Sequence, residues 1–483
     1  MITFCVSLLM LLAGYLFYGK FMEHIFGVDP SRRTPCFTKN DGVDYIPMSS
    51  WKVFLIQFLN IAGTGPIFGA ILGILYGPAA YLWIVLGCIF GGAVHDFFSG
   101  MISLRRGGAS LPEIIGDELG MTARQVMRVL SLVLMVLVGT VFAQTPATLL
   151  AAMTSNWGIT ANIWIVIVFA YYIMATLLPI DALIGRIYPL FGFALLVMAV
   201  GVLGGVFVHG GVWMPEVTDA FANHHPHSAV PIFPGLCITI ACGAVSGFHA
   251  TQSPMMARCM KNERMGRRIF YGAMITEGFV ALIWAAAAIT FANQLDVAGN
   301  TPYEKLLTAM TDPVSGKMNP GLVVSQICHS WLGSVGAILA ILGVVAAPLT
   351  SGDTALRCAR LIAADFLKVK QDRIIKRLML CLPIFAISIL LFFVDFQVIW
   401  RYFAWSNQTL SVFTFWAITM WLMRQGKCYW VTLIPGLFMT MVCSTYILVA
   451  SEGFGLSLTL SSILGGTFTL LLALLFVRKC RQK

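Results

Sequence analysis

Long apolar stretches, separated by short polar segments, run through nearly the whole 483-residue chain. An α-helix of about 20 apolar residues spans the hydrocarbon core of a bilayer. About thirteen stretches approach this length, and each predicts a transmembrane helix. They are residues 2–19, 53–76, 80–103, 129–153, 161–180, 187–208, 232–257, 268–293, 330–352, 374–394, 398–423, 429–450 and 455–477. The pattern predicts an all-α polytopic membrane protein in which residues 1–483 form a single transmembrane domain.

Charged residues are scarce and lie on one side of the predicted helices. Only 11% of the residues are charged, whereas a soluble domain has about 25%. Of the 31 Lys and Arg residues, all but Lys305, Lys317 and Arg401 fall in alternate loops and in the C-terminal tail. Positive residues mark the cytoplasmic side of a membrane protein, so we expect the N-terminus outside and the C-terminus inside.

The net charge of +10 therefore reflects topology and does not indicate a nucleic-acid partner. The expected partner is the anionic cytoplasmic leaflet of the lipid bilayer, which places a multi-pass protein in the cell inner (plasma) membrane. Residues 1–19 have no basic n-region and no clear small-residue cleavage site, so they predict a retained first span.

Two of the predicted spans carry helix breakers at their centres. The first contains FLNIAGTGPIFG (58–69), and the second contains ACGAVSGFHATQSP (241–254). The second break lies five spans after the first, so the two broken helices cross the membrane in opposite directions. Paired Gly/Pro interruptions at corresponding places in two halves are typical of inverted-repeat transporters and point to the binding site.

This spacing divides the chain into two five-helix repeats. The first repeat would cover 51–208, and the inverted second repeat would cover 232–424. Residues 1–50 would then form an extra first helix and a cytoplasmic loop, and residues 429–477 two additional helices.

The glycines at the first break have a second explanation. Gly65, Gly69, Gly73 and Gly77 recur at every fourth position, a pattern that lets two helices approach closely. A packing face needs no helix breaker, so Pro66 favours a true break. Both explanations can hold together.

Ionisable side chains are costly inside a membrane and are candidates for function. Glu277 lies near the centre of a span, where it could exchange a proton or bind sodium, or simply form a permanent hydrogen bond to a neighbouring helix. His95 and Asp96 could relay protons, or Asp96 could pair with an arginine at the membrane face. His249 follows the glycines of the second break and could contact substrate, carry a proton or form a structural hydrogen bond.

Hydroxyl and amide groups lie in two later spans. Thr350 and Ser351 could join backbone carbonyls of the first broken helix around a sodium ion, because hard cations prefer oxygen ligands. Together with Asp353, they could instead cap the helix that follows. Asn407 adds a further amide group within its span.

No residue pattern indicates a resident metal or an enzyme. His224, His225 and His227 form a tract that can bind metal, but no spaced cysteine or acid accompanies them. The twelve cysteines are scattered without a CxxC pair, so we expect small buried side chains. No nucleophile–base set is clustered, which disfavours a membrane enzyme.

Six motifs, in order along the chain, resemble the carbon-starvation protein A (CstA) family. They are GVDYIP (42–47), FLNIAGTGPIFG (58–69), HDFFSGMISLRRGGASLPEII (95–115), ACGAVSGFHATQSPMMARCMKNE (241–263), APLTSGDTALRCARLI (347–362) and WRYFAWSNQTL (400–410). The resemblance implies a transporter related to the amino-acid/polyamine/cation superfamily, with a LeuT-type five-plus-five inverted-repeat core. Family members are associated with uptake of small peptides, and others with proton-coupled uptake of pyruvate, when carbon is short. Longer members carry additional spans, and this chain is similar to a compact form.

These observations predict a secondary active transporter that imports peptides or pyruvate by alternating access, coupled to H⁺ or Na⁺ and needing no other cofactor. The expected substrate-binding residues are Asn60, Gly63, Thr64, Gly65, Gly243, Ser246, Gly247, His249, Gln252 and Asn407. The expected ion- or proton-coupling residues are Glu277, Thr350, Ser351 and Asp96. The alternative is a nutrient-sensing membrane receptor built on a transporter scaffold.

Overall fold

The computed structural model describes residues 1–481, with the exception of 155–156, 178–183, 211–212, 228–230, 312–315, 317 and 395. Lys317 and residues 178–180, which entered the predictions of topology and of one span, therefore lie outside the described residues. The described chain is helical, with isolated β-bridges in place of strands.

α-Helices make up both halves of the described chain. The first half contains α1 (Ile2–Ala13), α2 (Gly19–Phe26), α3 (Pro35–Thr38), α4 (Ser50–Ile61), α5 (Ala70–Gly73), α6 (Ala79–Leu86), α7 (Ala93–Arg105), α8 (Leu111–Leu119), α9 (Met121–Met153), α10 (Ala161–Leu177) and α11 (Ile184–His209). The second half contains α12 (Ile232–Thr239), α13 (Gly247–Ala257), α14 (Gly272–Gln294), α15 (Pro302–Met310), α16 (Pro320–Ala340), α17 (Ala346–Leu367), α18 (Ile374–Leu391), α19 (Phe396–Arg424), α20 (Trp430–Val449) and α21 (Leu458–Arg481).

The architecture is that of an all-helical polytopic membrane protein, as the apolar pattern predicted. Within the described residues, eight helices are long and apolar enough to cross a membrane, or nine if the bent pair Ser50–Ile61 and Gly65–Tyr76 forms one span. Other predicted spans are interrupted or shorter: α12 and α13 have 8 and 11 residues, and α10 has 17. The count of thirteen spans therefore stays a prediction.

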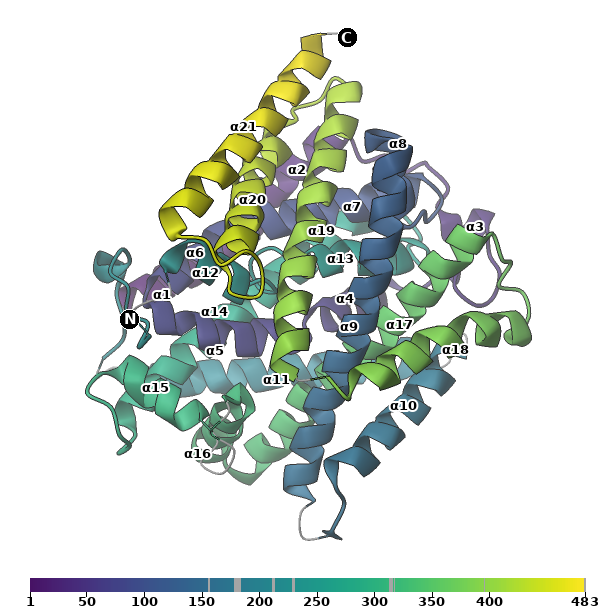
Figure 1. Ribbon diagram of the computed structural model, residues 1–483. Helices are drawn as coiled ribbons and strands as arrows, with labels where there is room; N and C mark the ends of the chain where they lie inside the picture. The colour runs from purple at the N-terminus through teal and green to yellow at the C-terminus, as the bar shows by residue number, and fades with distance from the viewer. Residues whose placement is uncertain are drawn as a thin grey trace.

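The broken helices lie in the interior of the bundle. Figure 1 shows α4, α13 and α14 near the middle of the molecule, with α20 and α21 at one edge. In the most apolar part of the span Glu263–Gln294, which includes α14, 89% of the residues are buried, against 17% in α21. An apolar helix that is buried on all sides belongs to the core of a bundle, so α14 is its central helix.

The first predicted break interrupts the helical ladder between α4 and α5. α4 ends at Ile61, and the chain resumes in a π-helical turn, Gly65–Gly69. The two halves of this span are bent by 54°. Pro66 occupies the first turn of the second half, a position where the missing N–H of proline costs no helical hydrogen bond.

The second predicted break lies between α12 and α13. Gly243, inside this unwound segment, has a φ of +96°, a conformation that residues with a side chain rarely adopt. A Cβ at Gly243 would also lie only 2.7 Å from Cβ of Ala281 in α14. Glycine is therefore required both by the backbone conformation and by the close approach to α14.

The glycine series packs the first broken helix directly onto the second. A Cβ at Gly65 would overlap Cβ of Cys242, and a Cβ at Gly69 would lie 2.9 Å from the carbonyl oxygen of Thr239. Inside a bilayer, helix association depends on such close van der Waals packing because burial from water contributes little. The structure thus shows both a break and a packing face, so the two explanations of these glycines hold together.

The substitution Gly69→Ala tests this packing. We expect it to lower the free energy of unfolding by about 1–3 kcal/mol, because the added methyl group meets backbone that cannot easily move. Gly204→Ala is the control, since no atom of the described residues lies within 4 Å of a Cβ built at Gly204 in α11. Thermal unfolding of both variants in detergent measures the difference. An equal shift in the two variants would contradict the packing role.

Candidate proton and substrate site

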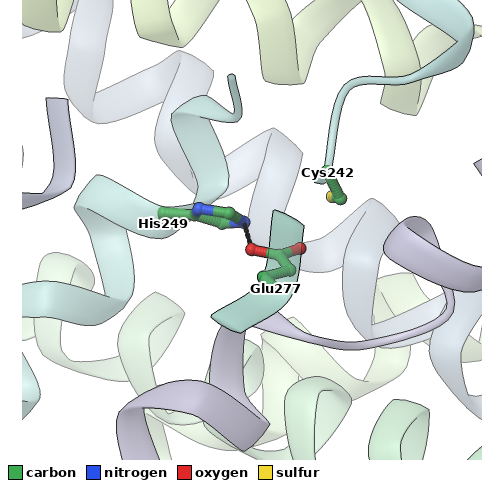
Figure 2. A group of neighbouring side chains, drawn as sticks. All are labelled: Cys242, His249 and Glu277. Carbon is green, nitrogen blue, oxygen red and sulfur yellow. Dashed lines mark ion pairs between the residues drawn. The ribbon is translucent and has the colours of Figure 1, made fainter. Parts of the chain in front are cut away.

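Three buried ionisable side chains from three helices form a continuous chain. Nδ1 of His249, in α13, lies 2.9 Å from Oδ2 of Asp96, in α7. Nε2 of the same ring lies 3.5 Å from Oε2 of Glu277, in α14. Figure 2 shows the imidazole and the Glu277 carboxylate facing one another. Each of these residues was predicted separately, and the structure brings them together; the three are named below the Asp96–His249–Glu277 chain.

The surroundings of the two carboxylates weigh against their alternative roles. Oδ1 of Asp96 lies 2.8 Å from Nδ1 of His95, so both oxygens face histidines and not an arginine. Neither carboxylate oxygen of Glu277 has a hydrogen-bond partner among the described residues. Its contact with a neighbouring helix is the 3.5 Å ion pair between Oε2 and Nε2 of His249 in α13, so a structural role for Glu277 stays an alternative.

The Asp96–His249–Glu277 chain is chemically suited to hold and move protons. Asp96, His249 and Glu277 are all 0% exposed, and an isolated charge at such depth is strongly penalised. An imidazole between two carboxyl groups can exchange a proton through either ring nitrogen. A proton gained or lost by any member therefore changes the charge balance between α7, α13 and α14.

Asn407 of α19 holds the start of α13 at the second break. Its Oδ1 accepts a hydrogen bond from the backbone N–H of Phe248 at 2.7 Å and another from the hydroxyl of Ser246 at 3.1 Å. A Cβ at Gly247 would overlap the backbone of α19, so the glycine permits this close approach. The predicted residues Ser246, Gly247 and Asn407 thus form one group, in which the asparagine satisfies backbone that the break exposes.

The first break is lined by polar groups from α4 and α17. The Ser351 hydroxyl donates a hydrogen bond to the carbonyl of Leu59 at 3.1 Å. The Asn60 amide and the Thr64 hydroxyl are buried and have no hydrogen-bond partner among the residues described. Because buried polar groups are nearly always paired, these unpaired groups make the break a candidate place for a ligand or a water molecule.

Two predicted residues lie apart from this arrangement. Nε2 of Gln252 donates to the Thr251 hydroxyl at 3.2 Å, near Cys358. The Thr350 hydroxyl donates to the Ala347 carbonyl of its own helix at 2.9 Å. A substrate role for Gln252 and a coupling role for Thr350 therefore stay predictions.

The alternative that Thr350, Ser351 and Asp353 cap a helix is wrong. α17 begins at Ala346 and continues through all three residues to Leu367, so no helix starts there. The Asp353 carboxylate is buried and accepts a hydrogen bond from the Tyr188 hydroxyl of α11. The sequence reasoning missed this pair because the side chains are 165 residues apart.

Cys242 also lies near the site, and the sequence patterns did not single it out as a candidate. Its Sγ and one ligand atom each of His249 and Glu277 all lie within 4.8 Å of one another. The available signal was its place inside the broken motif 241–254, next to Gly243.

A second ionic cluster lies where residues 27–49 pack on the bundle, and we name it the Asp44 cluster. Oδ1 of Asp44 lies 3.2 Å from Arg357, and Oδ2 lies 3.5 Å from Arg360. Burial raises the pKa of the Asp44 carboxyl, but Arg360, Arg357 and Arg258 outweigh burial and hold this pKa below its usual range. The cluster ties the loop before α4 to α17.

The histidine tract packs against aromatic residues at the far end of the first broken span. The His224 ring stacks on Tyr303 with centroids 4.8 Å apart, and the His225 ring lies 4.9 Å from Tyr76. The next turn includes Gly77, whose φ is +90°. These contacts give His224 and His225 a packing role.

An all-helical membrane bundle with two broken helices around buried ionisable groups defines the class of integral membrane transporters. Residues 1–163, 147–319 and 319–446 match the family model described as carbon starvation protein CstA. The chain belongs to this family, as its motifs predicted, and it is therefore a multi-pass protein of a transporter family and not an enzyme.

The sequence is similar to several bacterial membrane proteins. An uncharacterized membrane protein of Haemophilus influenzae is 47% identical over 338 residues, which cover 60% of this chain and 90% of that protein. The Escherichia coli peptide transporter CstA is 28% identical, covering 67% of this chain and 54% of its own length. The Escherichia coli pyruvate/proton symporter BtsT is 30% identical, covering 65% of this chain and 53% of its own. The chain thus spans about half the length of these two Escherichia coli relatives.

A solved structure shares the fold. The manganese transporter of Eremococcus coleocola superposes with a TM-score of 0.53 and 14% sequence identity, covering 92% of this chain and 99% of that one. At this identity the match supports the arrangement of helices alone.

The substitution Asn407→Leu tests the group at the second break. We expect it to lower the free energy of unfolding by about 1–3 kcal/mol, because it leaves the buried N–H of Phe248 without its acceptor. Ser411→Ala is the matched control, since the Ser411 hydroxyl donates to Gln408 within α19 itself at 2.7 Å. Thermal unfolding in detergent compares the two, and a loss as large in Ser411→Ala would contradict the role of Asn407.

Proposed function

We propose that this protein is a secondary active transporter that imports a small carboxylate-bearing nutrient by alternating access, coupled to protons. The observation that carries the proposal is the buried Asp96–His249–Glu277 chain beside the two helix breaks. It supplies titratable groups at the place where a transporter of this architecture binds its substrate.

Proton coupling follows from the cost of buried charge. Two carboxylates and an imidazole at this depth carry different net charges in their different protonation states. Unbalanced charge is costly in a low-dielectric interior. Protonation therefore shifts the equilibrium between conformations that expose Asp96, His249 and Glu277 to opposite sides of the membrane. Substrate that binds one protonation state better than another is then linked to proton movement.

The two breaks support a carboxylate substrate. The second half of each broken span begins at its break, one at Gly65 and the other at Gly247. Helix N-termini carry partial positive charge and unpaired N–H groups, which favour anions. Peptides and pyruvate, named for the two Escherichia coli relatives, both carry a carboxylate. The substrate-binding group would be Asn60, Gly63, Thr64, Gly65, Gly243, Ser246, Gly247, His249, Gln252 and Asn407.

Sodium is the second candidate coupling ion. The contact between the Ser351 hydroxyl and the Leu59 carbonyl joins two oxygens from α17 and the broken α4. Hard cations take such oxygen ligands. Proton and sodium gradients imposed separately distinguish the two coupling ions.

The repeat arrangement is part of the same proposal. Thirteen spans, with a LeuT-type core of 51–208 and 232–424, would place the N-terminus outside and the C-terminus inside. In that orientation the Asp44 cluster would lie at the cytoplasmic end of the bundle, where it ties residues 27–49 to α17.

A flux assay separates transport from a nutrient-sensing receptor. Purified protein in proteoliposomes is offered labelled pyruvate and labelled di- and tripeptides in parallel, under a proton or a sodium gradient. We expect accumulation of one of these classes inside the vesicles, driven by the proton gradient. Binding of substrate without net flux under either gradient would identify a receptor.

The substitution Glu277→Gln tests the coupling role. We expect it to reduce accumulation driven by a pH gradient at least about tenfold, a factor that corresponds to about 1.4 kcal/mol of lost coupling, while counterflow exchange is largely kept. Thr276→Ala is the control on the same helix, since the Thr276 hydroxyl donates only to the Gly272 carbonyl of α14 at 2.8 Å. Equal loss of accumulation and exchange would instead assign Glu277 to structure or to substrate binding.

A further inference from the structure

We propose that Cys242, His249 and Glu277 form a binding site for a thiophilic divalent transition-metal ion of the Zn²⁺ type. The donor atoms are Sγ of Cys242, Nε2 of His249 and a carboxylate oxygen of Glu277. The inference goes beyond the proposed transport function, because a transporter of a carboxylate coupled to protons needs no thiol at this place.

The three donors come from separate segments and share one space. Their ligand atoms all lie within 4.8 Å of one another, and all three residues are buried. Figure 2 shows Cys242 on the unwound segment after α12, with His249 and Glu277 opposite it on two helices. Zinc bonds of about 2.0–2.3 Å put tetrahedral ligands roughly 3–4 Å apart, so a small inward shift of the unwound segment completes the site.

The donor types select the metal. Thiolate and imidazole are ligands of zinc and similar transition metals, whereas Mg²⁺ and Ca²⁺ take oxygen ligands. Three protein ligands with a fourth position open to water or another ligand is the ligand number of catalytic zinc sites, whereas structural zinc sites have four. A metal held by Cys242, His249 and Glu277 would therefore keep one open coordination position.

The donor atoms are free to accept a metal. Within the described parts of the chain, Nε2 of His249 and both carboxylate oxygens of Glu277 have no hydrogen-bond partner. Sγ of Cys242 donates a long hydrogen bond of 3.6 Å to the Ser246 hydroxyl and also interacts with the His249 ring. Buried polar atoms without a hydrogen-bond partner are rare in folded proteins. Three such atoms, Nε2 of His249 and the two carboxylate oxygens of Glu277, lie together here, and Nε2 and Oε2 are 3.5 Å apart.

Asp96 completes the arrangement from behind the histidine. Its Oδ2 lies 2.9 Å from Nδ1 of His249. When Nδ1–H donates a hydrogen bond to this carboxylate, Nε2 carries the lone pair of the neutral ring on the side of Glu277. A carboxylate behind a metal-binding histidine fixes the ring and raises its basicity. The orientation of His249 thus has a cause independent of Glu277.

Bound metal would join the second helix break to the central helix α14. Cys242 lies in the break and packs against Gly65 of the other broken helix, whereas Glu277 lies in the central helix α14. A metal bridging the two would tie the unwound segment to α14 and hold one conformation. Because the ligands must lose their protons to bind, metal and protons compete for the site.

Cobalt(II) binding to the purified chain of residues 1–483 in detergent tests the site. Co²⁺ replaces zinc at such sites and gives a thiolate-to-cobalt charge-transfer absorption when a cysteine is a ligand. We expect this band to saturate at one Co²⁺ per chain and to be lost on addition of Zn²⁺. Cys242→Ser should remove the band, and Asp96→Asn should weaken metal binding about 10–100-fold.

Cys88→Ser is the matched control. Cys88 is equally buried and lies next to α14, but its Sγ donates to the Met274 carbonyl at 3.3 Å and faces backbone. The band should persist in this variant. Elution on size exclusion and thermal unfolding without metal identify any variant that has not folded, and zinc-dependent stabilisation of the wild-type chain against heat, lost in Glu277→Gln, is the second readout.

Absence of a thiolate band in the wild-type chain, or a band that persists in folded Cys242→Ser, would overturn the proposal. The outcome is independent of the transport proposal, since binding is measured without flux. Transport without metal binding would contradict the metal site and leave the transport proposal intact. Metal binding without transport would support the metal site and contradict the transport proposal.

Discussion

The structure depends on one constraint: backbone polar groups freed inside a membrane must find partners within the protein. At both helix breaks, a side chain from another helix supplies the hydrogen-bond partner. Asn407 of α19 accepts the N–H at the start of α13, and Ser351 of α17 donates to a carbonyl at the end of α4. The glycines between them let the two broken helices touch without side chains in the way. Without these partners the breaks would be costly defects; with them, the breaks become a stable place for a site.

The breaks in turn decide which side chains meet. Unwinding before α13 places Cys242 on an irregular segment and His249 in the first turn of a new helix, so both point at the central helix α14. That helix supplies Glu277, and α7 supplies Asp96 on the other side of the imidazole. Buried carboxylates of this kind would be costly alone. They are tolerated because each faces a histidine. A change in the protonation of Asp96, His249 or Glu277 therefore changes the electrostatic environment of the other two.

Much of this was readable from the sequence, and what was not has a physical reason. Helix breakers and membrane-length apolar runs act locally, so both breaks and the helical class were predicted, as were Asp96, His249 and Glu277 as separate candidates. Which of them touch depends on how helices far apart in the chain are rotated against one another, and no periodicity encodes that. The contacts of Cys242 and the Asp353–Tyr188 pair were missed for this reason. Asp353 was weighed as a helix cap because a polar triplet after an apolar run resembles a helix start. In the structure α17 runs through it, and its carboxylate accepts a hydrogen bond from Tyr188 of α11.

α17 connects the site to the far ionic cluster. It carries Ser351, which contacts the first break, and Arg357, which pairs with Asp44. Six residues of α-helix separate them, about 9 Å along a rigid axis. Opening the Asp44 cluster means separating a buried carboxylate from its arginines, which is costly unless other contacts change at the same time. A ligand that displaces the Ser351 contact at the first break also acts on α17. In the proposed cycle, the free energy of ligand binding there would offset the cost of separating Asp44 from Arg357 and Arg360. The two ionic groups differ in chemistry: Asp44 is paired with arginines that are always charged, whereas Asp96, His249 and Glu277 are titratable groups whose charge can change.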